Sequence, residues 1–193
     1  MPEDPVRVDG VLEHALVLAR RGDEAGFATL WRALHPPLLR YLAVRGNQNP
    51  EDIAGETWLQ VVRDLDGFAG GLQEFRGWLF TIARHRAVDA GRSAAARPAV
   101  PVADPASAGE HPVTPSAEQH VVEQDATARA LDLVRTLPPA QAEMVMLRVV
   151  AGLDVQQVAD LVGKSPGTVR VAVHRALRSL SRDPRVRSVR GGE

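Results

Sequence analysis

The hydrophobic positions of this chain recur at helical spacing, and neither half shows the alternation of apolar and polar residues that marks a strand. In the first half, the pattern predicts helices at about residues 8–21, 23–45, 50–65 and 73–92. Leu59 and Val62 belong to the expected apolar surface of the third helix, and Pro36 and Pro37 are expected to kink or interrupt the second. The sequence therefore predicts an all-α protein.

Between Leu153 and Leu180 the pattern predicts two short helices joined by a tight turn. Asp154 is a good N-cap for the first helix, and Gly163 can adopt the left-handed conformation that ends it. Ser165 then caps the second helix, and Pro166 occupies its first position, where a missing N–H costs nothing. This layout is typical of a helix-turn-helix, whose second helix enters the DNA major groove.

The second of these helices divides into an apolar face and a polar, basic face. The residues expected to face the core are Val169, Ala172, Val173, Ala176, Leu177 and Leu180. The residues expected to face outward are Thr168, Arg170, Val171, His174, Arg175 and Arg178. An amphipathic helix pair with a solvated basic face is the simpler interpretation. The charge distribution favours a phosphate-binding surface instead, because residues 164–190 hold eight Lys/Arg and one acid in a chain of net charge −1.

A change in composition near the middle of the chain predicts a linker. The stretch from Ser93 to Ser116 contains five of the fourteen prolines and no aromatic residue, so it has little with which to bury itself. We expect a helical unit at residues 8–93, a flexible linker at 94–116 and a second helical unit at 117–183.

Two neighbouring helices of the first unit have opposite charge. Residues 51–66 carry five acids against Arg63, whereas residues 72–97 carry five arginines against two acids, together with aromatic residues. Arginines interleaved with aromatic residues are typical of proteins that hold single-stranded nucleic acid. Trp78 is most simply a core residue, while Phe68 and Phe75 flank a glycine-rich loop and are open to either role.

Several protein classes are disfavoured by what the sequence lacks. The absence of cysteine excludes disulfides and thiolate zinc sites, and no signal peptide or apolar stretch of about 20 residues is visible, so we expect a cytoplasmic protein without membrane insertion. The six histidines show no metal-ligand spacing with a nearby acid, and no P-loop, G-x-S-x-G or G-x-G-x-x-G motif occurs. We therefore expect no enzyme activity, no cofactor and no metal.

Three blocks in order make the chain resemble an extracytoplasmic-function (ECF) sigma factor of the sigma-70 family. EDIAGETWLQVVRDLDGF at 51–68 resembles the helix that binds core polymerase, and EFRGWLFTIARHRAVDAGR at 74–92 resembles the promoter-melting segment. The stretch from Leu137 to Leu180 resembles region 4, which carries the helix-turn-helix. The resemblance implies a sigma-2-like helical bundle and a sigma-4-like helix-turn-helix domain, joined by the linker.

The resemblance also implies roles for individual residues. Asp52 and Glu56 would meet the β′ clamp helices of bacterial core RNA polymerase, and the loop from Asp66 to Gln73 would hold a flipped base of the −10 element. The residues implied at −10 DNA are Phe68, Phe75, Arg76, Arg84, His85, Arg86 and Arg92. The residues implied at −35 DNA are Lys164, Ser165, Thr168, Arg170, Val171, His174, Arg175 and Arg178. The implied partners are the polymerase (β′ clamp helices and β flap), promoter DNA and an anti-sigma factor.

Four features depart from the family pattern. Gly55 stands where glutamine is frequent, which lowers the helix propensity of that segment, and His85 stands where asparagine is usual. Val171 and Ala172 replace a commonly polar-then-basic pair, which bears on the −35 preference. The helix before the linker ends in alanines instead of a long basic run.

Another kind of DNA-binding protein competes with this interpretation. A conventional helix-turn-helix regulator with a helical sensor domain would bind a palindrome as a dimer. The acidic helix beside the basic, aromatic helix disfavours it, because a sensor domain needs neither. Initiation by core polymerase in the presence of this chain would separate the two interpretations.

Overall fold

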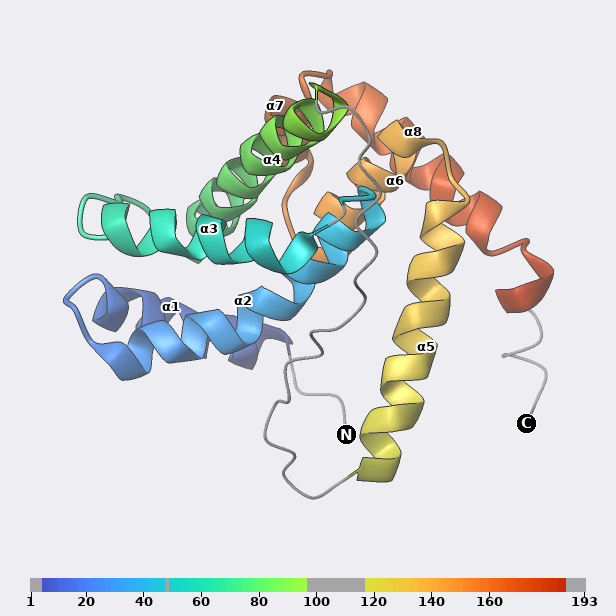
Figure 1. Cartoon of the computed structure of the whole chain (residues 1–193). Helices are drawn as coiled ribbons and strands as arrows, with labels where there is room; N and C mark the ends of the chain where they lie inside the picture. Colours follow the sequence, from blue (N-terminus) through green and yellow to red (C-terminus); the bar gives the residue numbers. More distant parts are fainter. Residues whose placement is uncertain (1–4, 48, 97–116, 187–193) are drawn as a thin grey trace.

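The computed structural model describes residues 5–47, 49–96 and 117–186, in which every regular element is a helix (Figure 1). The first unit contains α1 (Pro5–Ala19), α2 (Glu24–Val44), α3 (Pro50–Asp64) and α4 (Leu72–Ala96). The second unit contains α5 (Ala117–Arg135), α6 (Pro139–Val145), the π-helical turn η1 (Met146–Val150), α7 (Val155–Val162) and α8 (Pro166–Leu180). The expected all-α fold is confirmed. Residues 94–96 of the expected linker continue α4, and residues 97–116 lie outside the described residues.

The first unit is built on a close pairing of α1 with α2. A Cβ at Gly26 would lie 2.7 Å from the Cβ of Leu18 and 2.8 Å from the backbone oxygen of Ala15, so only glycine fits where the two helices meet. The assigned helix α2 continues through Pro36 and Pro37 without interruption, and the neighbouring Leu34 and Leu38 are buried. Burial on both sides of the prolines stabilises the helix against the two backbone hydrogen bonds that they remove.

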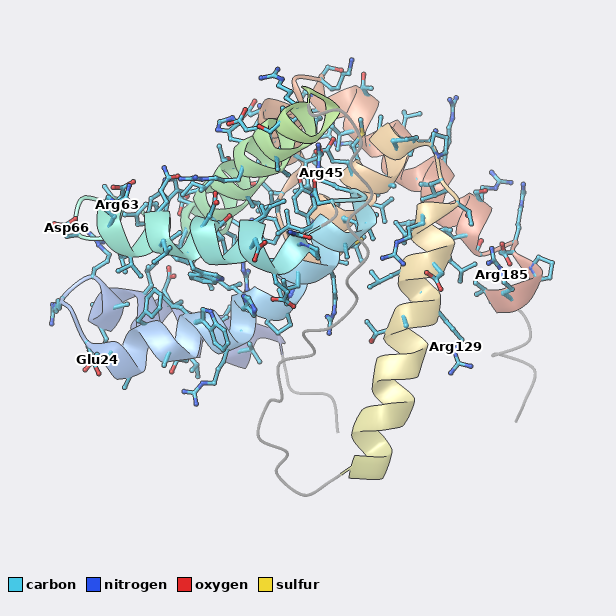
Figure 2. The ribbon with its side chains drawn as sticks, viewed as in Figure 1. Glu24, Arg45, Arg63, Asp66, Arg129 and Arg185 are labelled. Atoms are coloured by element: carbon cyan, nitrogen blue, oxygen red, sulfur yellow. The ribbon has the colours of Figure 1, made fainter. Side chains whose placement is uncertain are left out.

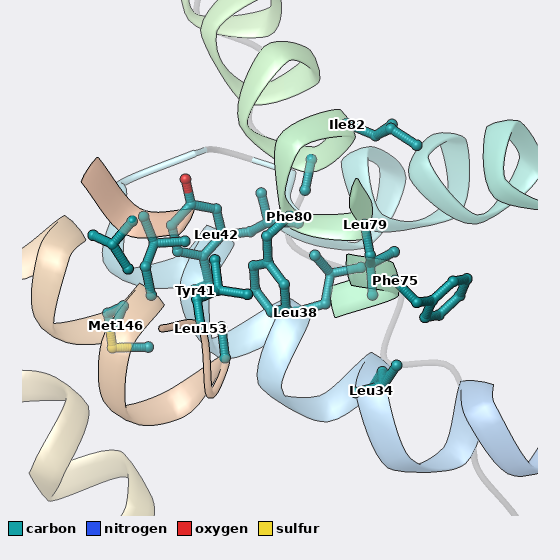
Figure 3. Packing of buried hydrophobic residues seen from close by; sticks show 14 of the residues in the cluster. Leu34, Leu38, Tyr41, Leu42, Phe75, Leu79, Phe80, Ile82, Met146 and Leu153 are labelled. Atoms are coloured by element: carbon teal, nitrogen blue, oxygen red, sulfur yellow. The ribbon is translucent and has the colours of Figure 1, made fainter. Parts of the chain in front are cut away.

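The two units pack directly on one another. The C-terminal half of α2 contributes Leu38, Tyr41 and Leu42 to a buried cluster that also holds Met146 and Leu153 of the second unit (Figure 3). The Tyr41 ring lies edge-on to the ring of Phe80 from α4, with 5.5 Å between centroids. The described parts of the chain therefore share a continuous hydrophobic core that crosses the boundary between the units.

The helix-turn-helix forms with the predicted local chemistry. The Asp154 carboxylate accepts from the Gln157 backbone N–H at 2.8 Å, and the Gln157 side chain accepts from the Asp154 N–H at 3.0 Å, which completes a capping box. Gly163 ends α7 with φ of 66°, and the Ser165 hydroxyl accepts from the Thr168 N–H at 3.2 Å to begin α8.

Three apolar residues that were predicted to face the core lie at the surface instead. Leu59 and Val62 of α3 are 66% and 57% exposed, and Leu177 of α8 is 44% exposed. The neighbouring helices cover the faces of α3 and α8 that carry Trp58 and Val173, respectively, and leave these three residues outside the covered stripe.

Candidate nucleic-acid interfaces

The outward side of α8 is an exposed and electrostatically unpaired surface. All of its sequence-predicted residues are exposed, and we call them the recognition face: Lys164, Ser165, Thr168, Arg170, Val171, His174, Arg175 and Arg178. Among the described residues, no carboxylate forms an ion pair with any of its cations. The opposite side is fixed by the buried Val169, Val173 and Ala176. This arrangement leaves the basic side chains available to a polyanion.

The arginines of α4, by contrast, each contact a carboxylate of this chain. The pairs are Arg76 with Asp9 at 2.7 Å, Arg84 with Glu143 at 3.0 Å, Arg86 with Glu56 at 2.9 Å and Arg92 with Asp89 at 3.7 Å. The acids come from α1, α6, α3 and α4 itself. His85 is exposed beside them. The structure thus places the four predicted −10 arginines on one helix and pairs each of them with a carboxylate of this chain.

A groove between α3 and α4 brings together residues that the sequence suggested for two different partners. It has a volume of about 810 Å³ and is lined by Asp52 and Glu56 from α3 and by His85 and Arg86 from α4. Asp52 accepts a hydrogen bond from the Asn49 side chain at 3.0 Å and stays exposed. The acidic and basic helices therefore form adjoining walls of one polar groove.

The loop after α3 forms a second, more open cavity of about 490 Å³. Phe68 and Trp78 line it and stack with 5.0 Å between ring centroids and 22° between planes. Arg63 and Asp66 also line this cavity, and Figure 2 shows both at this end of α3. The flat aromatic pair gives the loop a partly buried surface on which another ring can stack.

Phe75 is a correction to the sequence analysis. Its ring is fully buried and packs edge-on against Phe68 at 5.6 Å, so in this structure it supports the loop from within the core instead of facing a ligand. Phe75 and Phe68 lie close together in sequence, but only the packing of α4 on the rest of the first unit separates the buried ring from the half-buried one.

A polar cluster that the sequence analysis missed joins the two units. The Glu143 carboxylate of α6 accepts from the Tyr41 hydroxyl at 3.1 Å and from Arg84 at 3.0 Å, and it also pairs with Arg45 at the C-terminal end of α2. These four residues are the Glu143 cluster. The side chains of Glu143, Arg45 and Arg84 are 14%, 20% and 26% exposed. No sequence signal marks the cluster, because its members are 59 to 102 positions apart from Glu143.

Burial raises the pKa of the Tyr41 hydroxyl well above its ordinary value of 10, and the neighbouring Glu143 charge acts in the same direction, against the opposing effect of Arg45. Tyr41 is therefore a neutral hydrogen-bond donor to the carboxylate at physiological pH.

The exposed face of α3 also has an apolar centre that the sequence analysis missed. Leu59 and Val62 follow Asp52 and Glu56 at helical spacing, so the four residues share one exposed side of the helix. Two adjacent exposed hydrophobic side chains beside acids form a small mixed surface of the kind that protein partners cover. The available sequence signal was the spacing of Asp52 and Leu59, because residues seven positions apart lie on the same face of a helix.

Neither a metal centre nor a membrane span is found in the described parts of the chain. There, no three His, Asp or Glu side chains are grouped so that they could hold a metal ion. The helices of the same residues are too short or too polar to cross a bilayer.

Comparison with known families places both units. Residues 30–97 match the model of sigma-70 region 2, and residues 127–180 match the model of sigma-70 region 4. The chain is 34% identical over 190 residues to the ECF RNA polymerase sigma factor ShbA of Streptomyces griseus, covering 93% of this chain and 97% of that protein. It is 32% identical over 183 residues to the ECF RNA polymerase sigma factor SigD of Mycobacterium tuberculosis, covering 90% and 82%.

A third relative is longer. The chain is 34% identical over 166 residues to the ECF RNA polymerase sigma factor BldN of Streptomyces coelicolor, which covers 85% of this chain but only 62% of that protein's length.

Solved structures share the fold at lower identity. CnrH in complex with the cytosolic domain of CnrY superposes with a TM-score of 0.56 at 19% identity, covering 89% of this chain and 95% of that one. The sigma factor RpoE in complex with the anti-sigma factor NepR, from Bartonella quintana, gives a TM-score of 0.52 at 20% identity, covering 80% and 94%.

The helical fold, the helix-turn-helix and the two matched regions define a protein of the sigma-70 type. Within that type, the chain belongs to the ECF RNA polymerase sigma factors.

Proposed function

We propose that this chain is a promoter-specificity subunit that binds bacterial core RNA polymerase, recognises −35 and −10 promoter DNA, and contributes no covalent chemistry of its own. One observation carries the proposal: the chain presents an unpaired basic recognition helix in one unit, and an arginine helix beside an aromatic loop in the other. Duplex recognition needs the first surface, and capture of unpaired bases needs the second.

The recognition face of α8 is assigned to the −35 duplex. Arg170 lies near the N-terminal end of the helix that enters the groove, and Arg175 follows on the same exposed side. Lys164, Ser165 and Arg178 are assigned to phosphates, because the N-terminus of a helix and nearby cations favour anions.

The −10 element is assigned to α4 and to the loop before it. Arg76, Arg84, Arg86 and Arg92, with His85, follow the melted strand and the adjacent duplex along one helix. An unstacked base enters the cavity lined by Phe68 and Trp78. Flipping the base out of the duplex costs on the order of a few kcal/mol, and its stacking on these aromatic rings offsets that cost.

Core polymerase is assigned to the exposed face of α3. Asp52 and Glu56 supply negative charge toward the β′ clamp helices, and Leu59 and Val62 supply the apolar centre of the contact. Two relatives of known fold were solved with partners, CnrH with CnrY and RpoE with the anti-sigma factor NepR, which supports control of this chain by an anti-sigma factor as part of the proposal.

Charge reversal on α3 tests the polymerase assignment. Asp52→Arg with Glu56→Arg should weaken assembly with core polymerase by at least about tenfold, since two like charges then face a basic partner. Asp52→Arg alone tests the same contact without breaking the Glu56–Arg86 pair. The matched control is Glu24→Arg with Asp160→Arg, which reverses two exposed acids of α2 and α7.

The readouts are affinity for core polymerase and transcription from a mapped promoter, with circular dichroism to verify the fold. Equal assembly of wild type and the Asp52/Glu56 variant would show that α3 does not face the polymerase. Failure of the wild-type chain to support initiation would overturn the proposed function as a whole.

A further inference from the structure

Val171 is an unusual residue for its position on the recognition face. It is 49% exposed on the side of α8 opposite the buried Val169, Val173 and Ala176. Its helical neighbours on that side, three and four positions away, are all exposed, and apart from a glycine they are polar: Gly167, Thr168, His174 and Arg175. A valine at the centre of a polar face makes no contribution to the core, so its side chain is available to whatever the helix meets.

The chemistry of the major groove limits what such a side chain can recognise. The groove floor presents hydrogen-bond donors and acceptors, and its one apolar group is the 5-methyl of thymine. A branched aliphatic side chain has no polar atom to pair with a base edge, and it would bury a donor or acceptor without a partner over any base but thymine. Basic residues around Val171 place it over DNA, because they favour a polyanion over an apolar protein surface.

We propose that Val171 reads the 5-methyl group of one thymine in the −35 element. The proposal rests on the proposed promoter-binding function and adds a base class to it. The flanking Arg170 and Arg175 read or position neighbouring base pairs, while Val171 supplies preference by apolar contact alone. Burying about one methyl group against Val171 corresponds to about a fourfold change in affinity.

Replacing thymine by deoxyuridine removes that methyl group and nothing else. Holoenzyme assembled with the full chain is titrated against its mapped promoter, in which each −35 thymine is replaced singly by deoxyuridine. We expect one replacement to weaken binding by about fourfold and the others to have no effect. Val171→Ala should weaken binding to the thymine promoter by a similar factor and abolish the difference between thymine and deoxyuridine.

Leu177→Ala is the matched control, because Leu177 is similarly exposed at 44% but lies at the margin of the face. It should retain the thymine preference. If wild type distinguishes −35 base substitutions but tolerates every deoxyuridine, or if Val171→Ala keeps the preference, this inference is wrong and the promoter-binding function stands. Indifference of wild type to all −35 substitutions would instead contradict the proposed function.

Discussion

The arginines of α4 and those of α8 belong to one chemical type but meet opposite surroundings. On α4 each arginine reaches a carboxylate, and two of those acids, Asp9 and Glu143, lie on other helices far away in sequence. On α8 no acid of the described chain pairs with Arg170, Arg175 or Arg178. The two helices therefore differ in how available their arginines are to DNA. DNA can contact the arginines of α8 directly, whereas at α4 it must displace the carboxylates that the fold supplies.

This difference has an electrostatic consequence for the two proposed DNA contacts. A cation that is already paired releases its carboxylate when it binds a phosphate, so the net gain is smaller than for a cation surrounded by water. We expect α8 to provide affinity and steering, and α4 to become effective once the polymerase and the melted strand are in place.

The largest expected effect concerns the most buried of the α4 pairs. Glu143→Ala should lower the free energy of unfolding by about 1–3 kcal/mol, because it leaves two partly buried guanidinium groups and the Tyr41 hydroxyl without their acceptor. Asp89→Ala, which breaks the exposed Arg92 pair, should change it by less than about 0.5 kcal/mol. Urea unfolding followed by circular dichroism measures both, and equal effects would remove the distinction between structural and exposed pairs.

On α8, the comparison is sharpened by separating base contacts from phosphate contacts. Arg170→Ala should lower transcription and relax preference at one −35 position by about 1–3 kcal/mol, as expected for an arginine bidentate to guanine. Arg178→Ala should weaken binding to all sequences alike. Binding titrations against promoters with single-base changes in the −35 element separate the two kinds of contact. If both protein variants lose the same affinity for every promoter, Arg170 contacts the DNA backbone and not a base.

Alkaline pH tests the contribution of Tyr41, the buried residue that donates to Glu143 beside Arg84 of α4. The pKa of Tyr41 is raised in the folded protein, so unfolded chains lose the proton from about pH 10 while folded chains keep it. Stability should be complete below about pH 10 and fall above it by up to about 1.4 kcal/mol per pH unit.

Tyr41 is the only tyrosine in the chain, which makes its titration visible by ultraviolet absorbance. Tyr41→Phe should be less stable than wild type at neutral pH and should lack this contribution to the alkaline decline. The ordinary pKa of tyrosine lies inside the range from about pH 9 to about pH 11.5. If the free energy of unfolding falls with the same slope over this range in Tyr41→Phe as in wild type, other groups cause the decline.

The smallest expected effect is on salt dependence. Arg178→Ala should reduce the slope of log affinity against log salt by about 0.9, the value for one phosphate contact. Arg86→Ala should reduce it by less, because Arg86 is already paired with Glu56 at 2.9 Å and releases fewer counterions on binding. Affinities measured at several salt concentrations give the slope for each variant. A larger change of slope for Arg86→Ala than for Arg178→Ala would contradict the proposal that the α8 arginines are the more available to DNA.

The sequence alone determined the elements whose causes are local. Asp154, Gly163 and Ser165 mark the ends of α7 and α8 because caps and left-handed glycines act on backbone groups within a few residues. The outward position of the recognition face followed in the same way from helical periodicity around Val169 and Val173. The three motif blocks in order gave the family, which the comparisons confirmed.

Tertiary packing decided what depends on residues far apart in the chain. Phe75 became a core residue, while Leu59 and Val62 became surface residues, because helical periodicity gives a stripe but not which neighbour covers it. Glu143 reached Tyr41 across 102 positions because the second unit packs on the C-terminal half of α2. Charge pairing across such separations follows from the folded geometry and not from the local pattern, so the contrast between α4 and α8 belongs to the structure.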